Sequence, residues 1–347
     1  MRLDEPSWWY RPEGSGAIVR LLRPLGALYG WAVERRFEHA KPYRSSLPVI
    51  CIGNLTAGGT GKTPMAMQLG RVLASKGERP AFLTRGYGGR IKGPCWVDAQ
   101  SSMADEVGDE ALLLARVAPT MVSRDRAEGA RAIEASGAAS VIIMDDGLQN
   151  PSLHKDFTLA LVDARRGIGN GAVFPAGPLR ARLPFQLERV NAIVVNGLSE
   201  HRDDTALEWL AGLFRGPILT ARPEPVGDIA WIRGTRVVAF AGIGHPERFF
   251  ELLEALGGTV VARVPLPDHH RFTEKDAARI LALAASHDAI AVTTEKDFVR
   301  LASGSGPISE LRARSRTLDI RLVLDPRSTA QLEALLRPMI GAAPATR

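Results

Sequence analysis

Cysteine is scarce in this chain. Only Cys51 and Cys95 occur among 347 residues, so no disulfide framework can form, and their spacing does not match a zinc site. Two isolated cysteines are typical of a protein from a reducing compartment. The sequence excludes a small disulfide-bonded domain, while its length provides enough material for the core of one large domain or two smaller ones.

Long apolar runs are absent as well. The closest candidate, residues 17–33, is interrupted by Arg20, Arg23 and Pro24, and a membrane-spanning helix needs roughly 18 uncharged apolar residues. Its apolar part begins late and no small-residue cleavage site follows it cleanly, so we do not expect a secretory signal peptide. We predict that the protein remains in the cytoplasm.

Charge is not strongly biased toward either sign. Lys and Arg number 44 and Asp and Glu 38, which leaves a formal net charge of +6, and hydrophobic and charged residues make up 45% and 24%. These proportions exclude a disordered or collagen-like chain. The modest basic surplus could favour phosphates, anionic lipids or nucleic acid. Because the basic residues are dispersed and no recognition module occurs, we expect no nucleic-acid partner.

Aromatic residues are few, at 6%, but they concentrate in residues 1–47, which hold Trp8, Trp9, Trp31, Tyr10, Tyr29 and Tyr43. Apolar residues recur there at helical spacing and form one stripe: Ile18, Leu21, Leu22, Leu25, Leu28, Tyr29 and Ala32. Basic residues follow the stripe at Arg35, Arg36, Lys41 and Arg44. This pattern is typical of an amphipathic helix in a bilayer interface, although the same stripe could pack on its own domain.

From residue 48 onward, short β-rich runs alternate with helical ones. We expect strands at residues 49–52, 81–84, 141–144, 159–162 and 192–195, and a second set at 237–241, 260–264, 290–293 and 321–324. Helical patterns occupy residues 65–74, 110–116, 127–135, 246–256, 274–286 and 329–339. The alternation predicts an α/β fold with a mostly parallel sheet and helices on both faces. Prolines and glycines at 216–227 indicate a boundary between a core at 48–222 and a smaller α/β domain at 228–340.

A glycine-rich segment follows the first expected strand, with the sequence Gly53-Asn54-Leu55-Thr56-Ala57-Gly58-Gly59-Thr60-Gly61-Lys62-Thr63-Pro64. Its end, Gly61-Lys62-Thr63, matches the end of a Walker A phosphate loop. Backbone N–H groups of such a loop surround phosphate oxygens, and the next helix points its positive N-terminus at them. Lys62 can then reach the β- and γ-phosphates, and the Thr63 hydroxyl can ligate Mg²⁺. Residues 55–63 are therefore the candidate nucleotide-binding loop of a P-loop NTPase-type sheet.

The loop departs from the usual pattern at its start. Thr56 occupies the position of the first glycine of G-x-x-x-x-G-K-[ST]. The glycines at 58 and 59 resemble the deviant loops of nucleotide-dependent kinases and ATPases, but Ala57 occupies the position of their signature lysine. An ordinary glycine-rich turn is the alternative. The order of strand, Gly-Gly-x-Gly-Lys-Thr and helix favours a phosphate loop.

Two acidic pairs could complete such a site. Asp145 and Asp146 end an apolar strand, where a phosphate-loop enzyme needs a carboxylate for Mg²⁺ or its waters. Adjacent carboxylates repel each other unless a cation lies beside them, so we interpret this pair as linked to a metal rather than as a solvated turn. Asp109 and Glu110 begin a helical run, where a carboxylate can equally be an N-cap or a catalytic group.

Together these motifs resemble the tetraacyldisaccharide 4'-kinases, the lipid A 4'-kinases of Gram-negative bacteria. Besides the phosphate loop, the similar segments are Thr84-Arg85-Gly86-Tyr87-Gly88, Gly108-Asp109-Glu110, Asp145-Asp146-Gly147-Leu148-Gln149, Pro175-Ala176-Gly177-Pro178-Leu179-Arg180, Phe240-Ala241-Gly242-Ile243-Gly244, Pro267-Asp268-His269-His270 and Thr293-Thr294-Glu295-Lys296-Asp297. They extend from about residue 48 to residue 297, and the amphipathic N-terminus also fits. Thr56 in place of the first Walker A glycine is consistent with the phosphate loop of that family.

The resemblance implies an enzyme of lipid A biosynthesis that uses ATP and Mg²⁺. It implies transfer of the γ-phosphate to the 4'-hydroxyl of a tetraacylated glucosamine disaccharide 1-phosphate. It also implies a peripheral protein at the cytoplasmic face of the inner membrane, in contact with an anionic membrane surface through residues 1–47.

Carried over residue by residue, the resemblance makes Asp109 the general base toward the sugar hydroxyl, with His269 orienting or tuning it. Asp145 and Asp146 become Mg²⁺-linked carboxylates, and Arg180 stabilises the transferring charge. It gives no role to the motif at 293–297.

Two other functions stay open from the residues alone. The chain could be another P-loop small-molecule kinase or an ATP-dependent ligase. It could also be a nucleotide-operated switch or metallochaperone, which needs no catalytic base. An Asp109→Ala variant that binds ATP but loses transfer would favour a kinase over the switch.

Overall fold

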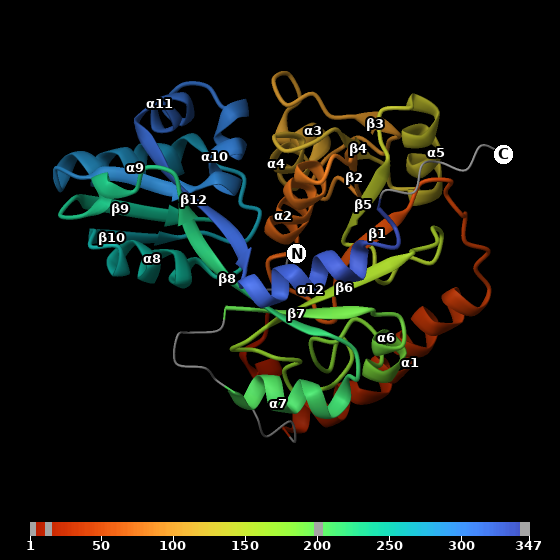
Figure 1. Cartoon of the computed structure of the whole chain (residues 1–347). Helices are drawn as coiled ribbons and strands as arrows, with labels where there is room; N and C mark the ends of the chain where they lie inside the picture. The colour runs from red at the N-terminus through yellow and green to blue at the C-terminus, as the bar shows by residue number, and fades with distance from the viewer. Residues whose placement is uncertain (1–4, 11–15, 198–203, 341–347) are drawn as a thin grey trace.

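The computed structural model describes residues 5–10, 16–197 and 204–340. Twelve strands of this part of the chain form one sheet in the order β10-β9-β11-β12-β8-β7-β6-β1-β5-β2-β4-β3 (Figure 1). The strands are β1 (Val49–Asn54), β2 (Pro80–Thr84), β3 (Cys95–Trp96), β4 (Thr120–Val122), β5 (Val141–Asp145), β6 (Phe157–Asp163), β7 (Ala192–Asn196), β8 (Ile218–Val226), β9 (Arg236–Ala241), β10 (Thr259–Pro265), β11 (Ile290–Thr294) and β12 (Ser315–Leu324). Among them, β8 with β12 and β3 with β4 are antiparallel, and the other neighbours are parallel.

Helices lie on both faces of this sheet. They are α1 (Ala17–Glu38), α2 (Lys62–Ser75), α3 (Ala104–Val107), α4 (Asp109–Ala115), α5 (Arg126–Ser136), α6 (Leu183–Leu187), α7 (Asp204–Leu213), α8 (Pro246–Ala255), α9 (Glu274–Ser286), α10 (Glu295–Arg300), α11 (Pro307–Arg314) and α12 (Pro326–Leu336), with 3-10 turns at Ser7–Tyr10, Ala230–Ile232 and Leu301–Ser303. The wholly buried strand β1 packs Ile50 and Ile52 with α2 and α4, and its alternate residues Val49 and Cys51 with α5. The predicted fold class is confirmed.

The stretch 216–227, interpreted as a domain boundary, forms strand β8. β7 pairs with β8 only as far as Ala221, so Pro223 and Pro225 lie beyond that pairing and leave no hydrogen bond to β7 unmade. From Ala221 to Val226, β8 pairs with β12 and thereby joins the two parallel halves of the sheet. Helix α12 then packs on the first half, with Leu332 and Leu336 in the core that contains α2. The division into 48–222 and 228–340 stays a prediction.

Helix α1 packs on the rest of the protein through its small residues. A Cβ on Gly26 would lie 2.6 Å from Val173 O, which is too close, whereas a Cβ on Gly30 would make an ordinary contact with Arg182 Cγ at 3.5 Å. Glu34 is buried, and its Oε1 accepts a hydrogen bond from Arg182 Nε at 2.6 Å. This face was missed in the sequence because glycine carries no hydrophobic signal, yet it lets two backbones approach closely.

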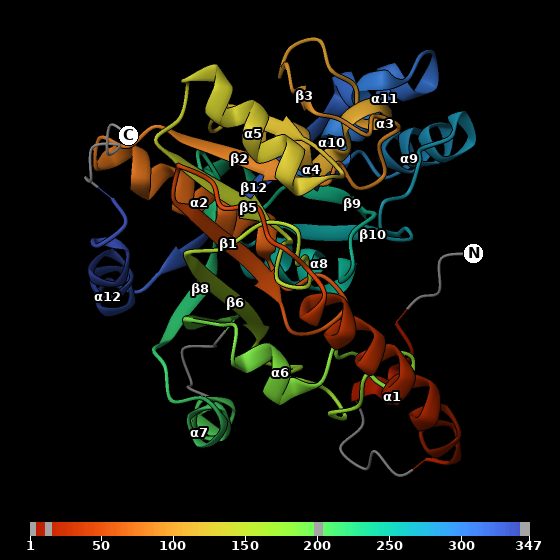
Figure 2. The same cartoon turned by 90° about the vertical axis from the view of Figure 1, so that its right-hand side faces the viewer.

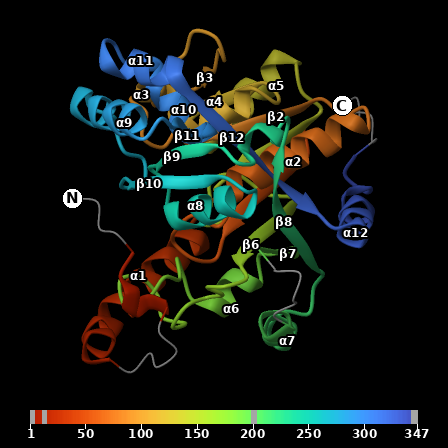
Figure 3. The ribbon, with the colours of Figure 1, turned by 90° about the vertical axis from the view of Figure 1, so that its left-hand side faces the viewer.

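The apolar stripe of α1 lies on the opposite, exposed face. The exposed fractions are 54% for Ile18, 77% for Leu21, 54% for Leu25, 60% for Leu28 and 56% for Trp31. Packing of this stripe in the core, one of the two alternatives, is therefore wrong. Figures 2 and 3 show α1 at the margin of the molecule, on the side away from α5, α9 and α11.

Trp9 departs from the expectation for the N-terminal aromatics. It is buried, and its Nε1 donates to Pro175 O at 3.2 Å, so it cannot face a membrane as Trp31 can. Within the described ranges, no helix has the length and apolar character that crossing a bilayer requires.

Candidate active site

The phosphate loop lies between β1 and α2, as predicted. Gly58 and Gly61 have φ of 102° and 94°, in the left-handed region that favours glycine. A Cβ on Gly61 would also lie 2.7 Å from Asn196 Nδ2, the amide that donates to Thr60 O at 2.9 Å. The next helix begins at Lys62, and Thr63 is buried in its first turn. The loop therefore has the backbone of an anion-binding helix N-terminus.

The start of the loop is held by the segment 175–180. Ala57 N donates to Pro178 O at 2.7 Å, and Arg180 Nε donates to Thr56 O at 3.1 Å. Thr56 and Leu179 form an isolated antiparallel bridge. Residues 56 and 57 thus pair with a second segment through their backbone atoms.

Asp146 lies beside the two cations predicted for the site. Arg180 Nη1 is 2.7 Å and Lys62 Nζ 3.8 Å from Asp146 Oδ1. Burial raises the pKa of Asp146, but the charges of Arg180 and Lys62 outweigh it and hold this pKa well below its usual range. The carboxylate is therefore ionised at neutral pH.

Asp145 has the opposite environment. It is 1% exposed, and neither carboxylate oxygen has a hydrogen-bond partner among the described residues. Burial, followed by the charges of Glu110 and Asp146, raises the pKa of Asp145 to about 7. A buried carboxylate without a partner is costly, and a cation or a proton removes that cost.

Asp109 and His269 come together from segments far apart in the sequence. Asp109 is the first residue of α4 and is 4% exposed, while His269 follows β10 with a φ of 56°. His269 Nδ1 and Asp109 Oδ2 are 3.0 Å apart, and Glu110 N donates to Asp109 Oδ1 at 2.9 Å. The pair is in contact without any further closure of the two halves.

Arg300, which the sequence reasoning missed, binds the same carboxylate. Its Nε donates to Asp109 Oδ2 at 2.6 Å, and its Nη2 also pairs with this oxygen. Arg300 Nη1 donates to Gly242 O and to Asp297 Oδ1, each at 2.7 Å. Burial raises the pKa of Asp109, but His269, Lys296 and Arg300 outweigh it and hold this pKa well below its usual range.

Lys296 is the second residue that was missed. Its Nζ lies 3.1 Å from His269 Nε2, 3.4 Å from Glu110 Oε1 and 3.6 Å from Asp268 Oδ1. Lys296 and Arg300 are four residues apart on α10, directly after β11. The motif at 293–297 was the available signal, since it places charged residues at the end of a strand, but its partners lie in α4 and after β10.

The phosphate loop and the Asp109 cluster are neighbours. Glu110 connects them, because its charge acts on Asp145 and its carboxylate faces Lys296. The loop after β9 also reaches the phosphate loop, since a Cβ on Gly244 would lie 3.7 Å from Gly59 N. Tyr87 borders the cluster, with its ring centroid 5.0 Å from that of His269. All the predicted site residues thus belong to one region at the junction of the two halves.

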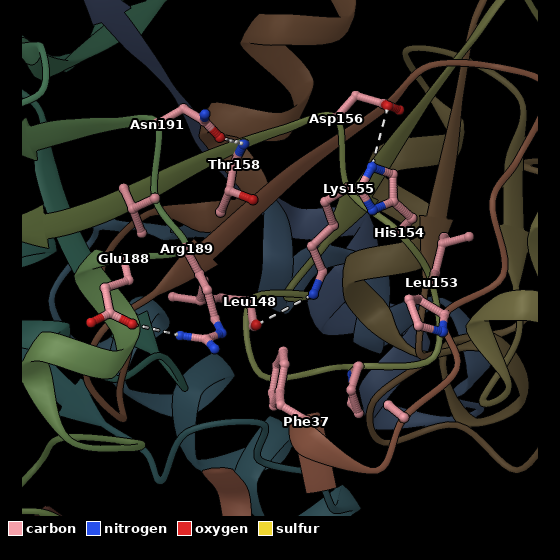
Figure 4. Close-up of a pocket in the computed structure, with 14 residues that line it drawn as sticks. Phe37, Leu148, Leu153, His154, Lys155, Asp156, Thr158, Glu188, Arg189 and Asn191 are labelled. Carbon is pink, nitrogen blue, oxygen red and sulfur yellow. Dashed lines mark hydrogen bonds and ion pairs between the residues drawn. The ribbon is translucent and has the colours of Figure 1, made fainter.

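A cavity of about 350 Å³ lies elsewhere (Figure 4). Its lining includes Phe37, Lys155, Asp156 and Thr158, and Lys155 Nζ donates to Leu148 O at 3.4 Å. Asp156 N bonds Val49 O at the beginning of β1, whereas the phosphate loop follows the end of that strand. This cavity is therefore separate from the candidate active site.

Comparison with known proteins agrees with this arrangement. The family model described as tetraacyldisaccharide-1-P 4'-kinase matches residues 18–338. A relative from Methylobacterium nodulans named tetraacyldisaccharide 4'-kinase is 50% identical over 308 residues, which cover 88% of this chain and 88% of its own length. One of the same name from Paramagnetospirillum magneticum is 48% identical over 320 residues, 92% of this chain and 94% of its own length.

A solved structure gives the same result. The chain resembles LpxK from Aquifex aeolicus in complex with ATP with a TM-score of 0.73 and 25% identity, over 93% of this chain and 99% of that one. These matches confirm the resemblance carried by the sequence motifs, and with it a kinase of lipid A biosynthesis. The chain belongs to the tetraacyldisaccharide 4'-kinase family.

Proposed function

We propose that this kinase carries out its transfer where the phosphate loop meets the Asp109 cluster, with the γ-phosphate of ATP passing to the 4'-hydroxyl of a tetraacyldisaccharide 1-phosphate. The observation that carries the proposal is the contact between Asp109 and His269, 160 positions apart, beside the loop that would hold the nucleotide. A nucleotide switch needs no such pair. The relatives named above support the identity of the acceptor.

ATP would bind through residues 55–63. The N–H groups of the loop and of the first turn of α2 would surround the β- and γ-phosphates, and Lys62 would neutralise their charge. Lys62 already lies within 3.8 Å of Asp146, so a small movement of its flexible side chain would bring it to the phosphate. Arg180, also beside Asp146, would stabilise charge on the transferring group.

The donors around Asp145 fit Mg²⁺. The ion prefers carboxylate, hydroxyl and phosphate oxygens, and Asp145 supplies two buried oxygens without a partner among the described residues. Asp145, Asp146 and the Thr63 hydroxyl would hold it together with the nucleotide. When bound, the ion would neutralise the developing phosphate charge. No group of three or more His, Cys, Asp and Glu side chains suited to a metal occurs in the described part of the chain, so the ATP oxygens would complete the shell.

Asp109 would accept the proton of the 4'-hydroxyl while that oxygen attacks the γ-phosphorus and ADP leaves. Its depressed pKa keeps it ionised but makes it a weak base. In a loose phosphoryl transition state, deprotonation is late and positioning matters more than basicity, so a weak base suffices. His269 would fix the orientation of the carboxylate.

The substrate would be reached from the cytoplasmic face of the inner membrane. A lipid with four acyl chains cannot leave a bilayer cheaply, because each exposed CH₂ costs about 0.8 kcal/mol. The exposed stripe of α1, with Leu21 at 77% and Trp31 at 56%, suits the depth of the headgroups, and the basic residues near the end of α1 would attract anionic lipid. The protein would thus be peripheral.

The experiment that tests this function incubates the purified protein with ATP, Mg²⁺ and the disaccharide lipid. A lipid phosphorylated at the 4' position supports the proposal. ATP hydrolysis without a lipid product would favour the switch, and phosphorylation of a soluble acceptor alone would favour another small-molecule kinase.

A further inference from the structure

Lys296 occupies an unusual position for a lysine. Its side chain is 20% exposed and reaches across from α10 to α4 and to the loop after β10. Its Nζ contacts one nitrogen, His269 Nε2 at 3.1 Å, and two carboxylates, Glu110 and Asp268. The contact with His269 is the shortest of the three and lies within hydrogen-bond distance.

The ammonium group is charged in this environment. Burial lowers the pKa of Lys296, but Glu110, Asp109 and Asp268 outweigh burial and raise it. An ammonium has three donors and no acceptor. His269 Nε2 must therefore accept a hydrogen bond from Lys296, which means that this nitrogen carries no proton.

The remaining proton of the neutral ring is then on Nδ1. That nitrogen lies 3.0 Å from Asp109 Oδ2, a carboxylate oxygen that can only accept, so both contacts of the ring require the same tautomer. Arg300 Nη2 lies 3.5 Å from His269 Nδ1, but it is much closer to Asp109 Oδ2 and donates there. A second proton on Nε2 would put two positive charges in contact.

We propose that Lys296 is a positioning residue, which holds His269 as the neutral Nδ1–H tautomer and thereby keeps the proton taken from the sugar hydroxyl on Asp109. The balance of the step is complete: the O–H proton goes to Asp109, the 4'-oxygen forms a bond to phosphorus, and the bond from phosphorus to the ADP oxygen breaks. The inference rests on the proposed role of Asp109 as the base. Its part about the tautomer depends on the contacts of the ring and on the charge of Lys296, and not on the role of Asp109.

Without the ammonium, the surroundings of His269 would favour a charged ring. Asp109 and Asp268 face it as carboxylates, Tyr87 borders its ring, and Arg300 is the other cation nearby. Loss of Lys296 would free Nε2 to take a proton and leave two carboxylates beside it, so the imidazolium would become stable at higher pH.

The test is nitrogen NMR of the full chain with ¹⁵N-labelled histidine. The chain has 7 histidines, so His269→Gln assigns the signal by its loss. In the wild type at about pH 7.5, His269 should show an unprotonated Nε2 and a protonated Nδ1. In Lys296→Met at the same pH, a measurable share of the rings should carry a proton on Nε2 as well. Lys296→Arg, which keeps the charged donor, should restore the wild-type pattern, and Lys275→Met on exposed α9 is the matched control.

Activity gives a second readout. Lys296→Met should lower kcat most on the acid side of the pH profile, where the freed ring takes up a second proton, with KM for ATP nearly unchanged. An Nε2–H tautomer or an imidazolium in the wild type at about pH 7.5 overturns the inference even if the Met variant fails to fold. A folded Met variant whose His269 has the same tautomer and the same protonation state as the wild type also overturns it. Transfer that survives in Asp109→Ala would instead refute the proposed base and leave the tautomer result standing.

Discussion

The phosphate loop and the Asp109 cluster differ in how the chain builds them. The loop is one continuous segment whose form depends on glycine conformations and on near neighbours such as Asn54, which donates to Gly58 O at 3.1 Å. The cluster assembles four side chains from three segments, at positions 109, 269, 296 and 300. Local rules of sequence are therefore sufficient for the first region, whereas the second exists only after the two halves of the sheet are joined.

The first way to test the contrast is Lys62→Ala. The side chain contacts Asp146 and not the core, and Asp146 keeps its ion pair with Arg180, so the fold should persist. Transfer should fall by about a thousandfold or more, because the variant loses the cation at the phosphates. Turnover and thermal melting measured together separate the two effects, with exposed Lys275→Ala as control. Activity within about tenfold of the wild type would contradict the phosphate-loop assignment.

The second test asks whether the cluster acts as one unit. His269→Gln and Asp109→Asn should each lower kcat by about a hundredfold or more, and the double variant should be little worse than the more damaging single one. Asp109→Asn also removes the charge that pairs with Arg300, whose side chain is only 7% exposed. This loss can lower stability, so melting temperatures must be measured together with the rates. Losses that multiply would show that the two residues act independently.

The sequence predicted the loop residue by residue, because glycine, lysine and threonine at fixed spacing report on local backbone. It suggested a pair of Asp109 and His269 only through the family resemblance, since nothing in the neighbourhood of either residue reveals the other, and their catalytic roles stay a prediction. The roles of Lys296 and Arg300 were not predicted. Both lie on a six-residue helix, and the partners of their charges depend on which elements pack against that helix.

Two features of the fold were not predicted from the sequence, for related reasons. Strand β8 contains prolines, which argue against a strand unless the pairing on one side has already ended. The packed face of α1 contains Gly26, Gly30 and Glu34 beside two valines, and a search for hydrophobic periodicity overlooks the glycines and the glutamate. In both cases the missing information was the position of a neighbouring element.

The exposed stripe of α1 provides a third and smaller test. Leu21→Glu with Leu25→Glu should weaken liposome binding and lower turnover on the lipid by about tenfold, while ATP binding and melting stay unchanged, because both side chains are exposed. Ala278→Glu with Ala282→Glu, the same charge change at the same spacing on exposed α9, is the matched control. Val33→Glu on the packed face should instead unfold the helix.

If the two glutamates on the stripe destabilise the protein, the loss of activity would reflect folding and would not support a membrane-docking role for the stripe. Unchanged liposome binding and turnover in a stable double variant would mean that the docking surface lies elsewhere.

The smallest expected effect concerns Asp145 in protein freed of metal ions. Its pKa of about 7 in the fold exceeds the value of about 3.9 in an unfolded chain, so the folded state loses stability as pH rises from about 4 to 7. Asp145→Asn removes this loss and should raise stability by about 1–2 kcal/mol above pH 7, with no gain at low pH.

Asp146→Asn should change stability in the opposite direction to Asp145→Asn. Its carboxylate is stabilised by Arg180 and Lys62, so its removal should lower stability at neutral pH. Both variants should need more Mg²⁺ for activity. Melting curves across this pH range decide the first point, and a stability of Asp145→Asn below that of the wild type at about pH 8 would refute the account of an unpaired carboxylate.

The most direct test of the central claim follows labelled γ-phosphate from ATP to the disaccharide lipid in wild-type protein and in Asp109→Asn, with ATP affinity measured on the same samples. We predict that both proteins bind ATP with affinities within about threefold, and that only the wild type yields the lipid phosphorylated at the 4' position at an appreciable rate. A folded Asp109→Asn variant that forms this product at a rate near that of the wild type would contradict the account.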